Sequence, residues 1–86
     1  MLWKSILIFS NGTFGLTTID AMLDSLHRPL APNEIVTQEG ISLRHKTTIM
    51  REDGPYPVYI EKSSKSQELF AYNMAKKGLQ NAGFKL

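Results

Sequence analysis

The chain of 86 residues is long enough for one domain with one modest core, and its apolar fraction of 42% excludes general disorder. It contains no cysteine, which excludes a disulfide framework and a thiolate metal site, and nothing indicates an oxidising compartment. Ten Lys and Arg against eight Asp and Glu give a net charge of +2, far below the basic excess of a dedicated nucleic-acid-binding protein. We therefore expect a single compact domain over residues 1–86.

The apolar run near the N-terminus does not have the length of a targeting signal. It covers Ile6 to Phe9, whereas the core of a secretory signal needs about seven to fifteen residues. No later segment approaches the roughly twenty apolar residues of a membrane span. We expect a cytoplasmic protein that does not bind a membrane.

The first predicted strand is "WKSILIF", in which the run Ile6 to Phe9 is apolar on both faces. This pattern is typical of a strand that is covered on both sides. The Asn11–Gly12 pair favours a hairpin whose return strand covers Thr13 to about Thr17. The alternative is that "SNGTFG" is a loop leading directly into a helix.

Residues 17–30, "TTIDAMLDSLHRPL", have the periodicity of a helix. Thr17 or Thr18 is suited to cap its first amides, and Pro29 ends it because the residue before a proline is disfavoured in the α region. The apolar residues recur at the spacing of one helix face and are Ile19, Met22, Leu23, Leu26 and Leu30.

The segment from Glu34 to Glu61 is predicted to be rich in β-structure. A short strand begins at Ile35 and Val36, and a second covers residues 41–49. In this second strand the apolar residues occupy odd positions, which predicts a wet, basic face formed by the even positions Ser42, Arg44, Lys46 and Thr48.

A turn at "REDGP" separates that strand from "YPVYI". Tyr56, Val58 and Ile60 are expected on one face of this last strand and Tyr59 on the other. Pro57 has no N–H to donate, so we expect the strand to lie at an edge of the sheet or to pair on one side only.

The last helix has the clearest signals. Ser64 and Gln67 have the spacing of a capping box, and Gly83 can supply the left-handed residue past the end, with Phe84 folding back onto Leu79. Small residues form a stripe that is predicted to face the sheet: Ala71, Ala75, Gly78 and Ala82. Large residues flank the stripe and are expected to fill the gaps beside it: Phe70 and Met74 on one side, Tyr72 and Leu79 on the other. The opposite arc, which is expected to face water, carries Asn73, Lys76, Lys77 and Gln80.

The resulting order β-(β)-α-β-β-β-α predicts an α+β fold. We expect a small antiparallel sheet of three to five strands with two helices packed on one face. Helices on one face cannot cover both sides of the first strand, so a partner or a second copy is expected to cover the other side.

No motif indicates an enzyme. The two histidines, His27 and His45, are not spaced as metal ligands, and no Gly-x-Ser-x-Gly turn is present. "SNGTFG" contains Gly-x-x-Gly, but the lysine that a phosphate-binding loop requires does not follow. The chain also lacks room for a small-molecule pocket beside its core. We expect no catalytic residue, no metal, no cofactor and no small-molecule substrate.

Basic residues are the candidates for nucleic-acid binding through phosphate contacts. They are interleaved with acidic residues, which fits an ordinary solvated surface equally well. The candidate set is Arg44, Lys46, Arg51, Lys62 and Lys65.

The order helix, three strands, helix over residues 17–82 resembles the αβββα order of double-stranded-RNA-binding domains and of HicA-type toxins. "SQELFAYNMAKKGL" has the small-residue and lysine rhythm of the last helix in such domains. The resemblance implies RNA binding by basic side chains. "EGISLRH" has the glycine and His45 but lacks the proline of the RNA binders' Gly-Pro-x-His loop, and the Gly-Ser-His context of the toxins is absent. The resemblance is therefore one of element order.

The favoured hypothesis is a small non-catalytic interaction module that binds another protein, as a regulator or inhibitor, or that self-associates. Compact inhibitors encoded by phages and mobile elements are an analogy for it. The segment "PYPVYI" is expected to offer a strand edge for docking. The predicted partner-binding residues are Trp3, Tyr56, Pro57 and Tyr59, and the alternative hypothesis is the nucleic-acid-binding domain described above.

Overall fold

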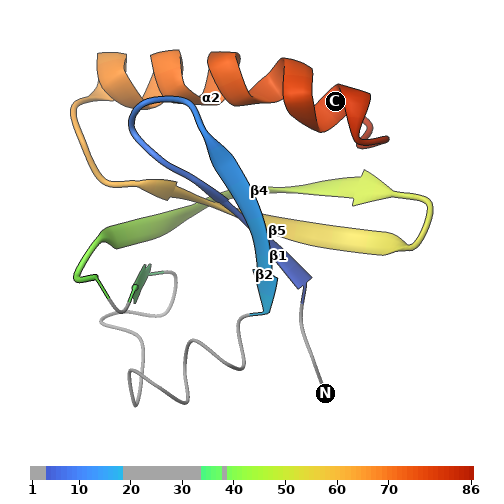
Figure 1. Ribbon diagram of the computed structural model, residues 1–86, viewed down its shortest axis with the longest axis horizontal. Coiled ribbons are helices and arrows are strands. Elements are labelled where there is room, and N and C mark those ends of the chain that lie inside the picture. The colour runs from blue at the N-terminus through green and yellow to red at the C-terminus, as the bar shows by residue number, and fades with distance from the viewer. Residues whose placement is uncertain (1–3, 19–33, 38) are drawn as a thin grey trace.

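The computed structural model describes residues 4–18, 34–37 and 39–86. In chain order its elements are β1 (Lys4–Ile8), β2 (Phe14–Thr18), β3 (Glu34–Val36), β4 (Ser42–Arg51), β5 (Gly54–Glu61) and α2 (Lys65–Asn81). The five strands form one sheet, and α2 packs on one of its faces (Figure 1). The structure confirms the α+β class.

The helix expected over residues 17–30 lies outside the described residues apart from its first two positions. Thr17 and Thr18 belong to β2, where they pair with Ser5 and Lys4 of β1. Their expected role as helix caps concerns the segment that follows them, which lies outside the described residues.

The sheet has the order β2-β1-β5-β4-β3 and is mixed rather than antiparallel. β1 runs parallel to β5, with Ile6 opposite Val58 and Ile8 opposite Ile60, and the other neighbouring pairs are antiparallel. The prediction of an antiparallel sheet was wrong at this junction. The first strand pairs with the last one, and no local pattern reveals the direction of such a long-range pairing.

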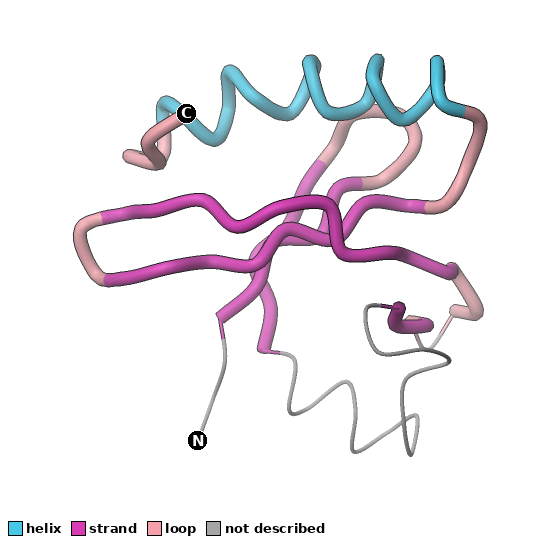
Figure 2. The backbone as a smooth tube through the Cα atoms, turned by 180° about the vertical axis from the view of Figure 1, so that it is seen from behind, coloured by secondary structure: helices cyan, strands magenta, loops and turns pink. Residues whose placement is uncertain are grey.

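The predicted hairpin between β1 and β2 is present, and its turn reaches α2 (Figures 1 and 2). The backbone N–H of Phe9 donates to the carbonyl of Thr13, and that of Gly12 donates to the carbonyl of Phe9, both at 2.9 Å. Gly12 has a φ of 88°, and the Asn11 side chain accepts hydrogen bonds from Thr13. The Asn-Gly signal therefore identified the turn correctly.

β4 contains a β-bulge at Lys46. Its register with β5 shifts between His45 and Thr47, so Lys46 has no residue opposite it. The extra residue reverses the alternation of side chains beyond it, and Leu43 and Ile49 accordingly belong to apolar clusters on opposite faces of the sheet. The expected face holds for its two basic residues, since Arg44 and Lys46 both reach side chains of α2, but not for Thr48, which lies beyond the bulge and next to His45.

β5 is the central strand, flanked by β1 and β4, and the expectation that it lies at an edge was wrong. Pro57 lies opposite Thr48 of β4, while the parallel ladder with β1 begins only at the next residue, Val58. The proline thus precedes that ladder, which explains how a central strand accommodates it. The expected alternation is confirmed, since Tyr56, Val58 and Ile60 are all buried.

Both ends of α2 have the expected form. The Ser64 side chain accepts a hydrogen bond from the backbone N–H of Gln67 at 3.2 Å. The Gln67 side chain does not complete a capping box and instead donates to the carbonyl of Ser10 in the β1–β2 turn. Gly83 has a φ of 96°, and Phe84 turns back into the core.

Apolar clusters lie on both faces of the sheet. The larger cluster packs against α2, and the smaller one, on the other face, contains Leu7, Ile35 and Leu43. β1 contributes to both, because Ile6 and Ile8 face α2 whereas Leu7 faces away, and all three are buried. The expected cover on both sides of β1 is confirmed, and it is present within a single chain, so no partner is needed to supply it. The larger cluster comprises Ile6, Ile8, Ile49, Tyr56, Val58, Ile60, Ala71, Ala75, Leu79 and Phe84.

The small-residue stripe of α2 faces the sheet, as predicted. Ala71 and Ala75 are buried. At Gly78 the helix lies so close to the Phe14 ring that an added Cβ would be 2.5 Å from the ring atom Cε1. Ala82, the fourth member of the stripe, is the exposed C-cap residue. The glycine and the two alanines therefore allow the helix to approach the sheet.

Candidate functional site

The outward side of α2 carries large apolar side chains that the core does not use. Leu69, Phe70 and Met74 are 58%, 50% and 56% exposed. Phe70 and Met74 were expected to fill the gaps beside the small-residue stripe, and this expectation was wrong. Leu79, on the other flank of the stripe, is fully buried as expected.

The β1–β2 turn lies against α2 at Met74. Gly12 lies so close to α2 that an added Cβ would be 2.5 Å from the Cβ of Met74. The backbone of the turn therefore occupies the space beside the helix that a large side chain was expected to fill. Helix periodicity alone predicts which residues flank a stripe, but it does not predict that another backbone segment will take their place.

Lysines accompany these apolar residues. Lys65 and Lys77 are exposed and Lys76 is half-buried, whereas the one acidic residue of α2, Glu68, is buried. All of α2 is described, so its exposed surface contains no carboxylate. We call the set Lys65, Leu69, Phe70, Met74 and Lys77 the α2 outer face.

Glu68 is paired with Arg44 of β4. The guanidinium donates to the carboxylate from Nε at 3.2 Å and also from Nη2, and the backbone N–H of Ser63 donates to it at 3.2 Å. Hydrogen bonds from Arg44 and Ser63 lower the pKa of Glu68, and the same carboxylate raises the pKa of Arg44. The pair thus joins the first turn of α2 to β4.

The basic residues proposed for nucleic-acid binding are mostly engaged with acidic partners. Three of the five form ion pairs, which are Arg44 with Glu68, Arg51 with Asp53 at 3.1 Å, and Lys62 with Glu34 at 3.1 Å. The Lys46 ammonium lies 5.2 Å from the centroid of the Tyr72 ring, and Lys65 is the first residue of α2. Each of these ion pairs reduces the positive charge offered to a phosphate.

Arg51 is separated from the other four and has a structural environment of its own. Its guanidinium donates to both carboxylate oxygens of Asp53 and to the hydroxyl of Tyr56, and it lies 4.9 Å from the ring centroids of Tyr56 and Phe84. Hydrogen bonds from Arg51 and Tyr56 lower the pKa of Asp53. This arrangement fastens the segment after α2 to the β4–β5 hairpin.

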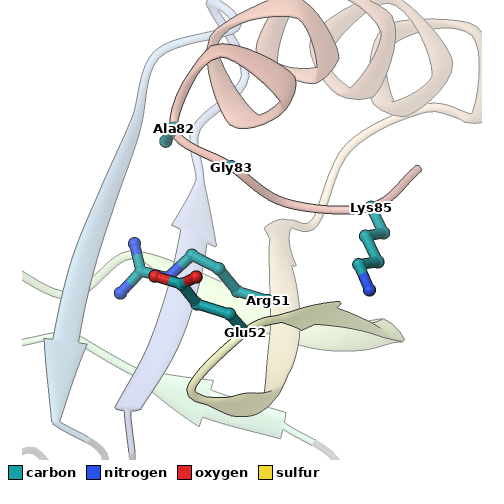
Figure 3. Close-up of a pocket in the computed structure, with 5 residues that line it drawn as sticks. All are labelled: Arg51, Glu52, Ala82, Gly83 and Lys85. Atoms are coloured by element: carbon teal, nitrogen blue, oxygen red, sulfur yellow. The ribbon is translucent and has the colours of Figure 1, made fainter.

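A shallow hollow of about 430 Å³ lies beside Arg51, between the end of β4 and the segment that follows α2 (Figure 3). It is lined by Arg51, Glu52, Ala82, Gly83 and Lys85. This lining has no histidine, hydroxyl or thiol side chain. The two cations and one carboxylate give it no convergent charge.

Of the residues predicted to bind a partner, the structure describes Tyr56, Pro57 and Tyr59. Tyr56 is buried in the core, and Trp3 lies outside the described residues. Pro57 and Tyr59 are half-buried on the sheet face away from α2, and burial raises the pKa of Tyr59. The Tyr59 ring packs edge-on against His45, with 5.5 Å between centroids.

His45 has no partners of a metal site among the described residues. His27 lies outside these residues, and Nε2 of His45 is 3.4 Å from the Thr48 hydroxyl. Across residues 4–18, 34–37 and 39–86, no group of three or more His, Cys, Asp or Glu side chains could hold a metal ion. Within the same residues, no helix has the length and apolar character needed to cross a bilayer.

Comparison with known proteins gives no relative from which a role could be transferred. No family model, no curated protein and no solved structure matches this chain.

Proposed function

We propose that this protein is a small non-catalytic interaction module that binds another protein through the α2 outer face and acts as a regulator or inhibitor of it. The observation that supports this proposal is the exposure of three large apolar side chains, Leu69, Phe70 and Met74, on one helix. Phe70 and Met74 lie one turn apart on the helix, and Leu69 lies about 100° around the axis from Phe70. Helices that present such exposed apolar side chains commonly dock into apolar grooves.

The helix that presents these side chains is firmly held. Its N-terminus is capped by Ser64 and tied to β4 through Glu68 and Arg44, and Phe84 anchors the segment after its C-terminus. Its other side supplies Leu79 to the core. A rigid helix loses little conformational entropy when it binds, which favours recognition by its outward side chains.

The ion pairs of Arg44, Arg51 and Lys62 favour this function over nucleic-acid binding. A phosphate backbone is bound mainly by cationic groups that are free to replace counterions. Three of the five candidate cations already have carboxylate partners. The apolar side chains at positions 69, 70 and 74 also contribute nothing to phosphate recognition.

Site-specific photo-cross-linking tests the proposal. A photoreactive benzoylphenylalanine is placed at position 70 in one variant and at position 50 in a matched control, because Met50 on β4 is also large, apolar and 48% exposed. In extracts of the expressing cells we expect protein adducts from position 70 that position 50 does not give. An excess of unlabelled wild-type protein should compete for these adducts, and an excess of the Phe70→Ser variant should not.

The proposal is wrong if position 70 gives no adduct above that of position 50. It is also wrong if the adducts of position 70 disappear after nuclease treatment, because the partner is then held through nucleic acid. A cross-linked dimer of the chain would identify the partner as a second copy.

A further inference from the structure

We infer that the partner of the α2 outer face is an acidic protein that offers an apolar pocket bordered by carboxylates. This inference rests on the proposed function and adds the chemistry of the partner to it. It is carried by charge complementarity, because the apolar anchors lie among cations and no exposed acid of α2 accompanies them.

The exposed side of α2 carries no carboxylate for a specific reason. Glu68 is the acidic residue of α2, and its carboxylate is buried and bound by Arg44. Lys65 and Lys77 are therefore left on the outward side with no carboxylate beside them on the helix. Lys46, exposed on the bulge of β4, adds a further cation next to Tyr72 of the helix.

The exposed acidic residues of the described chain lie in turns rather than on α2. Glu39 precedes β4, and Glu52 and Asp53 form the turn between β4 and β5 (Figure 1). The exposed side of α2 is therefore positively charged, although the net charge of the whole chain is only +2. Such a surface steers an acidic partner toward it and repels a basic one.

The spacing along the helix brings the apolar and cationic groups together. One line along the helix carries Phe70, Met74 and Lys77 at i, i+4 and i+7. A second line carries Lys65 and, four residues later, Leu69. Each of the three apolar side chains therefore shares a line of the helix with a lysine. In a complex, the apolar side chains would supply the buried contact area. Carboxylates of the partner would lie at the border of this area and pair with the lysines. A lipid surface fits less well, because Asn73 and Gln80 lie exposed on the same arc and interrupt its apolar area.

The test uses designed probes of defined chemistry. The first is a fluorescent amphipathic helical peptide of Glu and Leu, about 20 residues long so that it spans the length of α2. The second has each Glu replaced by Lys, and the third has each Leu replaced by Ser. Vesicles containing phosphatidylserine and a duplex RNA complete the set, and binding is measured by anisotropy or co-sedimentation at low and at moderate salt.

We expect the Glu–Leu peptide to bind, and the Lys–Leu and Glu–Ser peptides to bind at least about tenfold more weakly. Lys77→Glu should weaken binding of the Glu–Leu peptide by roughly three- to tenfold. Lys85→Glu is the control, because it makes the same change in net charge at an exposed lysine outside α2. Raising the salt should weaken binding of the wild type more than that of the Lys77→Glu variant.

The inference is overturned if the Glu–Leu peptide does not bind, if the Lys–Leu peptide binds equally well, or if Lys77→Glu and Lys85→Glu have the same effect. Stronger binding to the vesicles or to the RNA than to the Glu–Leu peptide also overturns it. These failures are distinguishable from failure of the proposed function. Adducts from position 70 that are insensitive to salt and to Lys77→Glu would retain the interaction module and reject an acidic partner, whereas the absence of adducts would reject the module itself.

Discussion

The buried carboxylate of Glu68 on α2 is bound by the guanidinium of Arg44 on β4, which donates from two of its nitrogens. Arg44 lies on the helix side of the sheet, because its neighbour Leu43 belongs to the apolar cluster on the other face. The pair therefore fixes the start of α2 to the sheet, and it removes from the exposed helix surface the one acidic side chain that α2 has.

Replacement of Arg44 by Met should destabilise the fold while keeping most of the aliphatic packing of that side chain. Glu68 would retain only the Ser63 N–H as a donor, and a buried carboxylate with too few donors costs about 1–3 kcal/mol. The lower part of this range is expected, because the Arg44 side chain is 43% exposed and solvent screens its charge. Urea unfolding at neutral pH measures the change. Lys65→Met, which replaces another cation by methionine at an exposed position, should have a smaller effect.

Glu68→Gln should reveal how this pair depends on pH. The pKa of Glu68 is lowered in the folded state, so its contribution to stability is present above the unfolded value of about 4.3 and is lost as the pH falls through the folded value. The difference in unfolding free energy between the wild type and Glu68→Gln should therefore be largest near neutral pH and should shrink below about pH 4. A difference that stays constant from pH 7 to strongly acidic solution would show that the Glu68 charge does not stabilise the fold.

Gly12→Ala should cost more than Gly40→Ala, although both glycines have nearly the same backbone conformation. Their φ values are 88° and 87°, so each substitution has a similar backbone strain of about 1–2 kcal/mol. A Cβ on Gly40 would meet nothing within 4 Å, whereas one on Gly12 would lie 2.5 Å from the Cβ of Met74. This clash should add about 1–3 kcal/mol, measured by urea unfolding. Equal costs at the two positions would mean that the turn does not pack tightly on α2.

Phe84→Ala should be strongly destabilising even though Phe84 follows the last helix. Its ring is buried, packs edge-on against Tyr56 at 4.8 Å between centroids and lies beneath the Arg51 guanidinium. Loss of a buried aromatic ring costs about 3–5 kcal/mol. Leu86→Ala, at a residue that is 40% exposed, should change the midpoint of unfolding very little. Similar midpoints for the two variants would show that the segment after α2 is not anchored.

Substitutions on the two sides of α2 should differ in their effect on stability, because one side packs in the core and the other is proposed to bind a partner. Leu79→Ala removes a fully buried side chain and should cost about 2–5 kcal/mol, whereas Phe70→Ser, at a half-exposed position, should cost less than about 1 kcal/mol. Thermal unfolding followed by circular dichroism measures both. A large loss of stability in Phe70→Ser would mean that this residue serves the core, and the α2 outer face would then lose its main anchor.

Features that depend on residues close together in the chain were predictable from the sequence. The Asn11–Gly12 turn, the Ser64 cap, the Gly83 terminus and the inward stripe with Ala71 all appear as expected. Their physical reasons are backbone preference, local hydrogen bonding and helix periodicity, and each of these acts within a few residues. Such local signals identify the helices and strands of the chain, and their presence together predicts the α+β class.

Features that depend on which distant segments meet were decided only by the tertiary structure. The parallel pairing of β1 with β5, the bulge at Lys46 and the packing of Gly12 against Met74 each join parts of the chain that share no local pattern. Such features placed β5 at the centre, put Leu43 and Ile49 on opposite faces and brought the β1–β2 turn against Met74. Sequence periodicity specifies the faces of each element, but strand order, register and the approach of one backbone to another are properties of the assembled core, where close packing selects a single arrangement.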